Sequence, residues 1–244
     1  MKTLTIAWIT WLETIRRKDI YVLAILAGVL LTTLASMDIF SLEGVTSYVQ
    51  DMGLIMTWIF SWIVTVTVST RQLPGEESRG TIFPLMAKPV SRFEIIAGKL
   101  LGSWTVAGTA TAVFYILVIA VTSFKGGKFD FIVLSQAFLG HFVTLGIISG
   151  MGILFSTRMT RDAATVLTYI FSISCITLIP DIPRLLATVR GPAATALAVI
   201  YNIFPHFEVF DMRIRVVHNY GPLPAGVLTI TLLYGLSLMA FMLT

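Results

Sequence analysis

The sequence is poor in charge and in cysteine. Only 12% of its 244 residues are charged, against roughly 25% in soluble domains, whereas 56% are hydrophobic. So few charges cannot cover a water-facing surface of this size, which excludes a soluble enzyme, a nucleic-acid-binding domain and a disordered chain. The single cysteine, Cys175, excludes an intrachain disulfide and any metal site built from several cysteines. The composition is that of an integral membrane protein.

Sequence motifs for catalysis are absent as well. No G-x-x-x-x-G-K-[ST] loop occurs, so the chain does not bind and hydrolyse ATP by that route, and no G-x-S-x-G motif occurs. The three histidines lack metal-ligand spacing, and a solvated charged loop explains Glu208, Asp211 and His218 better than a metal site does. We therefore expect no catalytic residue, no cofactor-binding residue and no metal site in this chain.

Long uncharged stretches are abundant, and they predict an all-α integral membrane protein. A helix crosses roughly 30 Å of hydrocarbon with about 20 apolar residues. Six stretches fit this length and are predicted transmembrane helices: 20–37, 52–70, 100–124, 131–157, 163–180 and 216–244. A seventh stretch, 191–207, has a shorter apolar centre between prolines, which predicts a re-entrant or interfacial helix.

The distribution of Lys and Arg predicts the orientation of these spans. With six spans, eleven basic residues fall on the side that holds the N-terminus, 71–99 and 158–162, and six fall on the other side. Because an excess of Lys and Arg marks the cytoplasmic side, both termini are predicted to be cytoplasmic. The expected location is the plasma (inner) membrane, with multiple crossings.

Residues 1–19 have the pattern of an amphipathic helix. The large apolar side chains recur at three- and four-residue intervals and share one face: Leu4, Trp8, Trp11, Leu12 and Ile15. Tryptophan favours the headgroup level, so we expect a helix lying on the cytoplasmic leaflet. The alternative is a first turn continuous with the span at 20–37. A signal peptide is disfavoured because the basic cluster follows the patterned segment.

The connection at 71–94 is predicted to be a structured cytoplasmic elbow. Pro74 can open a short helix with Glu76 and Glu77 in its first turn, and Gly80 can close it after Arg79. Ser91 and Glu94 have the spacing of a capping box at the start of the next helix.

These residues carry a resemblance to a known family, the permease subunits of type-2 ABC transporters. The connection between spans two and three in that family has acidic residues, Gly-Thr, an apolar stretch, a Pro-Val-Ser-Arg-like turn and Gly-Lys. The residues here that match this order are Glu76, Glu77, Gly80, Thr81, Leu85, Pro89, Val90, Ser91, Arg92, Gly98 and Lys99.

The resemblance implies a single permease domain over 1–244 that works with other subunits. Residues 71–94 would form the coupling helix that docks into an ATPase subunit, with Glu76, Glu77, Arg79, Gly80 and Thr81 at its docking surface. Arg92 and Lys99 would be cytoplasmic or headgroup anchors. ATP and Mg would be bound by the partner ATPases, and a second permease copy or paralogue would complete the assembly in the lipid bilayer. The region 181–224, which contains several prolines, would form an extracytoplasmic lid, and nucleic acid is not an expected partner.

Two further features lie within the predicted spans. The pairs Gly98/Gly102 and Gly146/Gly150 allow close approach between helices, either within one subunit or at a seam between subunits or with substrate. His141 is a polar residue inside a span, where it either contributes to a substrate path or is a hydrogen-bonded structural histidine.

Two other functions remain open on the sequence. An intramembrane hydrolase would use Glu76 or Glu77 to activate water, and it would work without any ATPase. A membrane assembly or anchoring subunit would bind partners and transport nothing.

Overall fold

The computed structural model describes residues 2–16, 21, 25, 28, 29, 32, 45–78, 91–124 and 126–243. This part of the chain consists of helices and the turns between them, without a strand. The α-helices are α1 (Lys2–Ile15), α3 (Val45–Thr70), α4 (Gln72–Ser78), α6 (Arg92–Phe124), α7 (Phe131–Ser156), α8 (Arg161–Thr177), α9 (Ile182–Leu186), α10 (Pro192–Ile203), α11 (Arg213–Val217) and α12 (Ala225–Met242). Two 3₁₀-helices, η1 (Ile179–Asp181) and η2 (Phe207–Phe210), interrupt the later part of the chain. The all-helical class predicted from the sequence is confirmed for these residues.

Five helical segments in the described ranges are long and apolar enough to cross a membrane. They are Ser47–Thr70, Arg92–Phe124, Phe131–Ser156, Arg161–Leu186 and Ala225–Met242. The pair Pro192–Ile203 and Phe207–Val217, bent by 44°, counts as one further crossing if it is a single broken span. The span predicted at 20–37 lies largely outside the described residues. The total number of crossings, and the re-entrant course of 191–207, therefore stay predictions.

Helix boundaries differ from the predicted spans at α12, which begins at Ala225 and not at 216, and at α6. The uncharged stretch begins at residue 100, but α6 begins at Arg92 and extends over 33 residues. A charge marks the end of the apolar zone and does not stop a helix, because Arg, Glu and Lys are good helix formers. The helix begins where Ser91 caps it.

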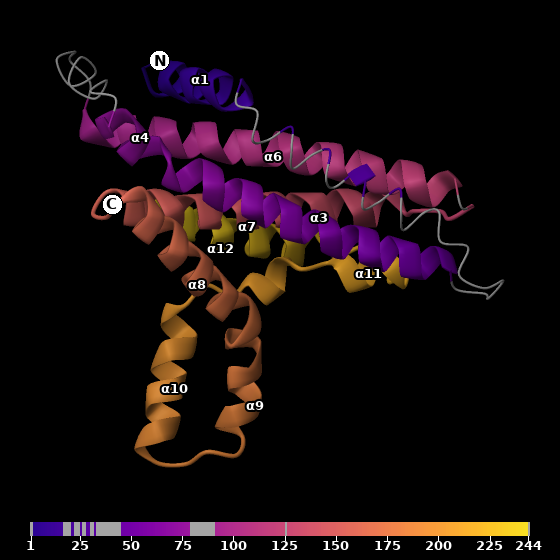
Figure 1. The fold of residues 1–244 in the computed structure, drawn as a ribbon. Coiled ribbons are helices and arrows are strands. Elements are labelled where there is room, and N and C mark those ends of the chain that lie inside the picture. Colours follow the sequence, from indigo (N-terminus) through magenta and orange to yellow (C-terminus); the bar gives the residue numbers. More distant parts are fainter. Residues whose placement is uncertain are drawn as a thin grey trace.

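The bundle is organised around α7, which packs against α3, α6, α8 and α12. Figure 1 shows α3, α6 and α7 lying side by side, with α1 lengthwise along α6. The end of α3 with α4, the beginning of α6, the beginning of α8 and the C-terminal end of α12 lie at one end of this bundle (Figure 1). The segments α9 and α10 project away from it as a pair.

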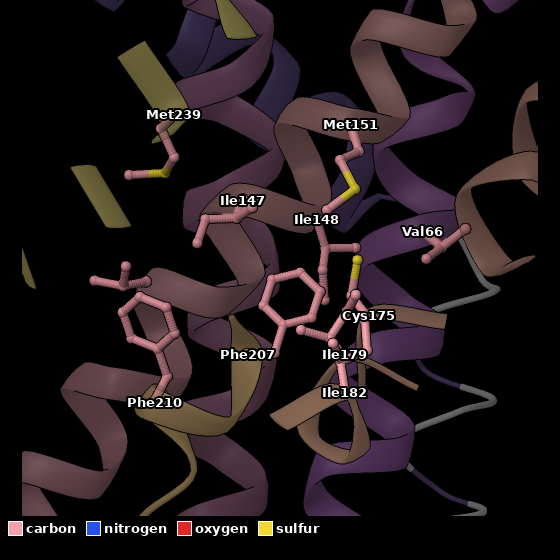
Figure 2. Close-up of a cluster of buried hydrophobic side chains, with 11 residues drawn as sticks. Val66, Ile147, Ile148, Met151, Cys175, Ile179, Ile182, Phe207, Phe210 and Met239 are labelled. Atoms are coloured by element: carbon pink, nitrogen blue, oxygen red, sulfur yellow. The ribbon is translucent and has the colours of Figure 1, made fainter. Parts of the chain in front are cut away.

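The main hydrophobic core forms where η2 enters between the long helices. Phe207 and Phe210 are 2% and 0% exposed and pack among apolar residues of α3, α7, α8 and α12. Figure 2 shows Phe207 beside Ile148 and Cys175, with Phe210 further along the same cluster. A β-carbon on Gly140 would lie 2.7 Å from the Phe210 carbonyl oxygen, so only glycine permits this approach of η2 to α7. Part of the region predicted as a lid is therefore embedded in the core.

Buried polar side chains are satisfied mainly within the helices. In α3, the hydroxyls of Thr57, Ser61 and Thr65 each donate to the carbonyl four residues earlier. Between helices, Ser103 of α6 and Ser149 of α7 share a hydrogen bond of 2.5 Å. Such bonds satisfy polar groups that water cannot reach in hydrocarbon.

Candidate functional site

The candidate coupling region begins with α4, which follows α3 directly and packs against α7. The sequence predicted that Pro74 opens this helix with Glu76 and Glu77 in its first turn. That placement is wrong: α4 begins at Gln72, and the two glutamates lie in its last turn. Pro74 is tolerated at the third position because the first N–H groups of a helix have no partner within it. Carboxylates in a last turn are not stabilised by the helix dipole, which favours cations there.

The middle of the coupling region lies outside the described residues. This applies to Arg79, Gly80, Thr81, Leu85 and Pro89, whose placement at a docking surface stays a prediction. The description resumes at Ser91, at the beginning of α6.

The capping box predicted at the start of α6 is confirmed. The Ser91 backbone N–H donates to the Glu94 carboxylate at 2.8 Å, and the Glu94 N–H donates to the Ser91 hydroxyl at 3.2 Å. The arrangement satisfies two backbone donors reciprocally and fixes the first turn of α6. Arg92 is exposed next to it, as an anchor would be, whereas Lys99 is only 3% exposed and so does not extend freely into a headgroup layer.

The two glycine pairs contact segments of the same chain. A β-carbon on Gly98 would lie 2.7 Å from the Ile6 β-carbon, and one on Gly102 would lie 2.6 Å from the Thr10 β-carbon. Because Ile6 faces Gly98 and Thr10 faces Gly102, α1 and α6 run in the same direction. On the apolar face of α1, Leu4 and Trp8 are exposed, whereas Trp11 packs against valines of α3 and α6.

The second pair lies on α7. Gly146 faces Met239 and Trp104, and Gly150 faces Met242 and Leu100. These contacts bring α7 close to α6 and α12. The sequence analysis does not predict the approach of α1 to α6. A pattern that indicates it is present, because small and β-branched residues recur at helical spacing on a face of α1 away from the tryptophans: Thr3, Ile6, Thr10 and Thr14.

His141 lies inside the bundle near the middle of α7. It is fully buried and stacks on Trp58 of α3, with ring centroids 4.2 Å apart and planes within 4°. Tyr115 of α6 approaches from another side at 5.9 Å. Neither ring nitrogen has a hydrogen-bond partner in the described part of the chain. A buried polar group without a partner calls for an explanation, because native structures contain few.

No cluster for metal binding is present within the described ranges. Three or more His, Cys, Asp or Glu side chains do not gather there in a metal-binding arrangement. Asp211 instead pairs with Arg213 at 2.6 Å, and His218 contacts the ring of Tyr220.

Comparison with known proteins gives the family. A family model described as "ABC-2 family transporter protein" matches residues 4–244. The chain belongs to this family. The resemblance to type-2 ABC permeases found in the sequence is thereby confirmed over nearly the whole chain. No curated protein matches the chain at a significant level. As an ABC-2 family protein with several apolar helices, it is a multi-pass membrane protein.

Proposed function

We propose that this ABC-2 family protein is the permease subunit of an ATP-driven exporter. Separate ATPase subunits would bind and hydrolyse ATP, and the chain would couple that hydrolysis to transport or extraction of a substrate. A second copy or paralogue would complete the membrane part, in the plasma (inner) membrane. Family membership favours this function over the intramembrane hydrolase.

The observation that carries the proposal is the continuity of α6 with the coupling region. The capped turn at Ser91 forms the end of the coupling region, and from there α6 runs unbroken for 33 residues. A helix of that length is about 50 Å long, which exceeds the thickness of the hydrocarbon. A displacement applied at its first turn is therefore carried through the membrane to the other end of the bundle.

The charges at the same end of the bundle support a cytoplasmic position. Arg71, Arg92, Arg158 and Arg161 lie in the turns and helix ends around α4, α6 and α8. Because basic residues concentrate on the cytoplasmic side, this end would face the ATPases. With this orientation, the exposed Leu4 and Trp8 of α1 would lie against lipid at the cytoplasmic interface.

The docking surface would centre on Glu76 and Glu77. The resemblance to type-2 ABC permeases implies that the acidic residues of this connection lie at that surface, and carboxylates form charge-assisted hydrogen bonds with basic side chains of a partner.

Reversing both charges tests this assignment. The double variant Glu76→Lys/Glu77→Lys should abolish stimulation of the partner ATPase while the folded permease still reaches the membrane. A matched control is the exposed pair Asp181→Lys/Glu208→Lys, near the other end of α8 and in η2, which should leave stimulation unchanged. Unchanged stimulation in the first variant would remove these glutamates from the docking surface. Hydrolytic activity without any ATPase would favour the hydrolase, and ATPase turnover that never responds to substrate would favour the assembly subunit.

A further inference from the structure

A small pocket lies on the side of the bundle between α3 and α8. Its volume is about 230 Å³, and its walls are mostly aromatic and aliphatic. Trp58 and Trp62 come from α3, and Ile173 and Ile176 come from α8. The isoleucines are 45% and 38% exposed, so the pocket opens to the outside of the chain.

One charged residue lines this pocket, Arg213 at the beginning of α11. Its guanidinium carbon lies 5.6 Å from the centre of the Trp58 ring. The side chain is 29% exposed, so the guanidinium is only partly removed from solvent. An arginine among apolar helices is costly unless it is paired, and such residues in membrane proteins mark functional sites by default.

Asp211 pairs with only one edge of this guanidinium. The Arg213 Nε donates to the two carboxylate oxygens at 2.9 and 3.0 Å, and Nη2 donates to one of them at 2.6 Å. A guanidinium has five N–H donors in a planar fork, and both N–H groups of Nη1 remain outside this pair. No hydrogen bond engages Nη1 within the part of the chain that the structure describes. The Asp51 carboxylate of α3 also acts electrostatically on Arg213, but it makes no hydrogen bond to it in the described part of the chain, so the second edge keeps its donors for a planar oxyanion.

Contacts within the bundle hold the two tryptophans that form the aromatic wall of the pocket. Trp58 stacks face to face with His141, which is fully buried in α7. The other indole is also held, because the Trp62 Nε1 donates to the Ser172 hydroxyl at 2.9 Å. Both aromatic walls thus have fixed orientations before any ligand binds, which lowers the entropic cost of binding.

We propose that this pocket binds an amphipathic anion, a carboxylate or phosphate carried on an apolar chain. The oxyanion accepts hydrogen bonds from the free edge of Arg213, as in bidentate arginine–carboxylate and arginine–phosphate pairs. The apolar chain lies along Trp58, Trp62 and the isoleucines and leaves through the open side. The pocket holds the charged head and the first part of the chain, not a whole lipid. Binding of the anion does not depend on the proposed function. The role of the pocket as a substrate or lipid subsite of a permease does rest on the proposed function.

Quenching of tryptophan fluorescence by a brominated probe measures this binding directly. The purified full chain is placed in phosphatidylcholine nanodiscs and titrated with 4-bromoundecyl phosphate, whose bromine lies in the first part of the chain and quenches indoles on contact. Saturable quenching is expected, with at least about tenfold weaker binding for the uncharged alcohol 4-bromoundecan-1-ol, because a hydrogen-bonded charge is lost. Trp58→Phe should reduce the quenched fraction. Equal affinity for the phosphate and the alcohol would overturn the proposal.

The charge pair is tested with a neutral double variant. Asp211→Asn/Arg213→Gln removes both charges of the hydrogen-bonded pair together, and it should weaken phosphate binding by about tenfold or more. The matched control is Arg215→Gln on the same short helix, since Arg215 is partly exposed and donates to the Gly221 carbonyl. Should the double variant fail to fold, Arg213→Lys keeps the charge and loses the planar edge, and it should also weaken binding. Unchanged affinity in these variants would overturn the proposal.

Two nanodisc compositions separate the sources of the anion. Phosphatidylglycerol with brominated acyl chains is compared with phosphatidylcholine brominated in the same way. Preferential quenching by phosphatidylglycerol, with displacement of the phosphate probe, assigns the site to an anionic lipid. Binding of the soluble probe alone assigns it to a free amphipathic anion, and both results support the shared chemistry. No ATPase is needed, so a failed coupling experiment leaves this result unaffected.

Discussion

Ile6 packs directly onto Gly98, where a β-carbon on the glycine would lie 2.7 Å from that of the isoleucine. One turn further, Thr10 packs onto Gly102 in the same way. The N-terminal helix is therefore packed against the first half of α6, whose first turn forms the end of the coupling region. In the function proposed above, α1 and the beginning of α6 would move as one body.

Filling this contact should separate the two helices. Gly98→Leu/Gly102→Leu should lower the stability of the chain by about 1–3 kcal/mol, because the added side chains overlap α1. It should also make α1 accessible to limited proteolysis and weaken ATPase stimulation. The control is Gly226→Leu in α12, where a β-carbon would meet nothing within 4 Å. Unchanged proteolysis of α1 in the double variant would show that the contact does not hold α1.

The capping box at the beginning of α6 should matter for coupling more than for insertion. Ser91→Ala removes the hydroxyl that accepts from the Glu94 N–H and should cost about 1 kcal/mol. We expect an unchanged amount of inserted protein, a small fall in thermal unfolding temperature and reduced ATPase stimulation. Ser135→Ala is the control, because Ser135 is exposed and donates only to the carbonyl of Ile132 in its own helix. Full stimulation by Ser91→Ala would show that coupling does not depend on this cap.

The insertion of η2 into the core should dominate the stability of the outer connection. Phe210→Ala should cost about 3–5 kcal/mol, because Phe210 is 0% exposed and its loss leaves a cavity among α7, α12 and η2. Thermal unfolding in detergent measures the change. Phe124→Ala, at a side chain that is 92% exposed, should change it by well under about 1 kcal/mol. Similar losses for the two variants would contradict the buried position of η2.

His141 can be tested by keeping its ring and removing its polar atoms. His141→Phe preserves stacking on Trp58 and removes two buried nitrogens that have no described partner. Because an unsatisfied buried group costs about 1–3 kcal/mol, stability should stay equal or rise. Thermal unfolding is measured together with the ATPase turnover of the assembled complex.

The turnover measurement separates the two roles left open for His141. Lost turnover in a stably folded His141→Phe protein would support a substrate path, whereas unchanged turnover would support a purely structural histidine. His218→Phe, at an exposed position, controls for nonspecific effects of the substitution. A large loss of stability would contradict the absence of a partner and would indicate a hydrogen bond to His141.

The coupling region shows how far sequence reasoning reached. Ser91 and Glu94 were recognised as a capping box because that motif depends on residues three apart, and local geometry alone decides it. The predicted position of Glu76 and Glu77 along α4 is wrong because α4 begins at Gln72, two residues before Pro74. A proline stops a helix only where its N–H is needed, and in a first turn it is not.

The amino-acid sequence by itself determined that this chain is a helical membrane protein of the ABC-2 family. The free energy of placing a segment in hydrocarbon is nearly a sum over its own residues, so the apolar stretches and their flanking charges are sufficient. Only the tertiary structure decided that α1 rests on α6, that η2 enters the core, and that Trp58, His141 and Arg213 meet. Such contacts join residues far apart in the sequence and depend on the shapes of the helix surfaces in contact, which no local pattern records.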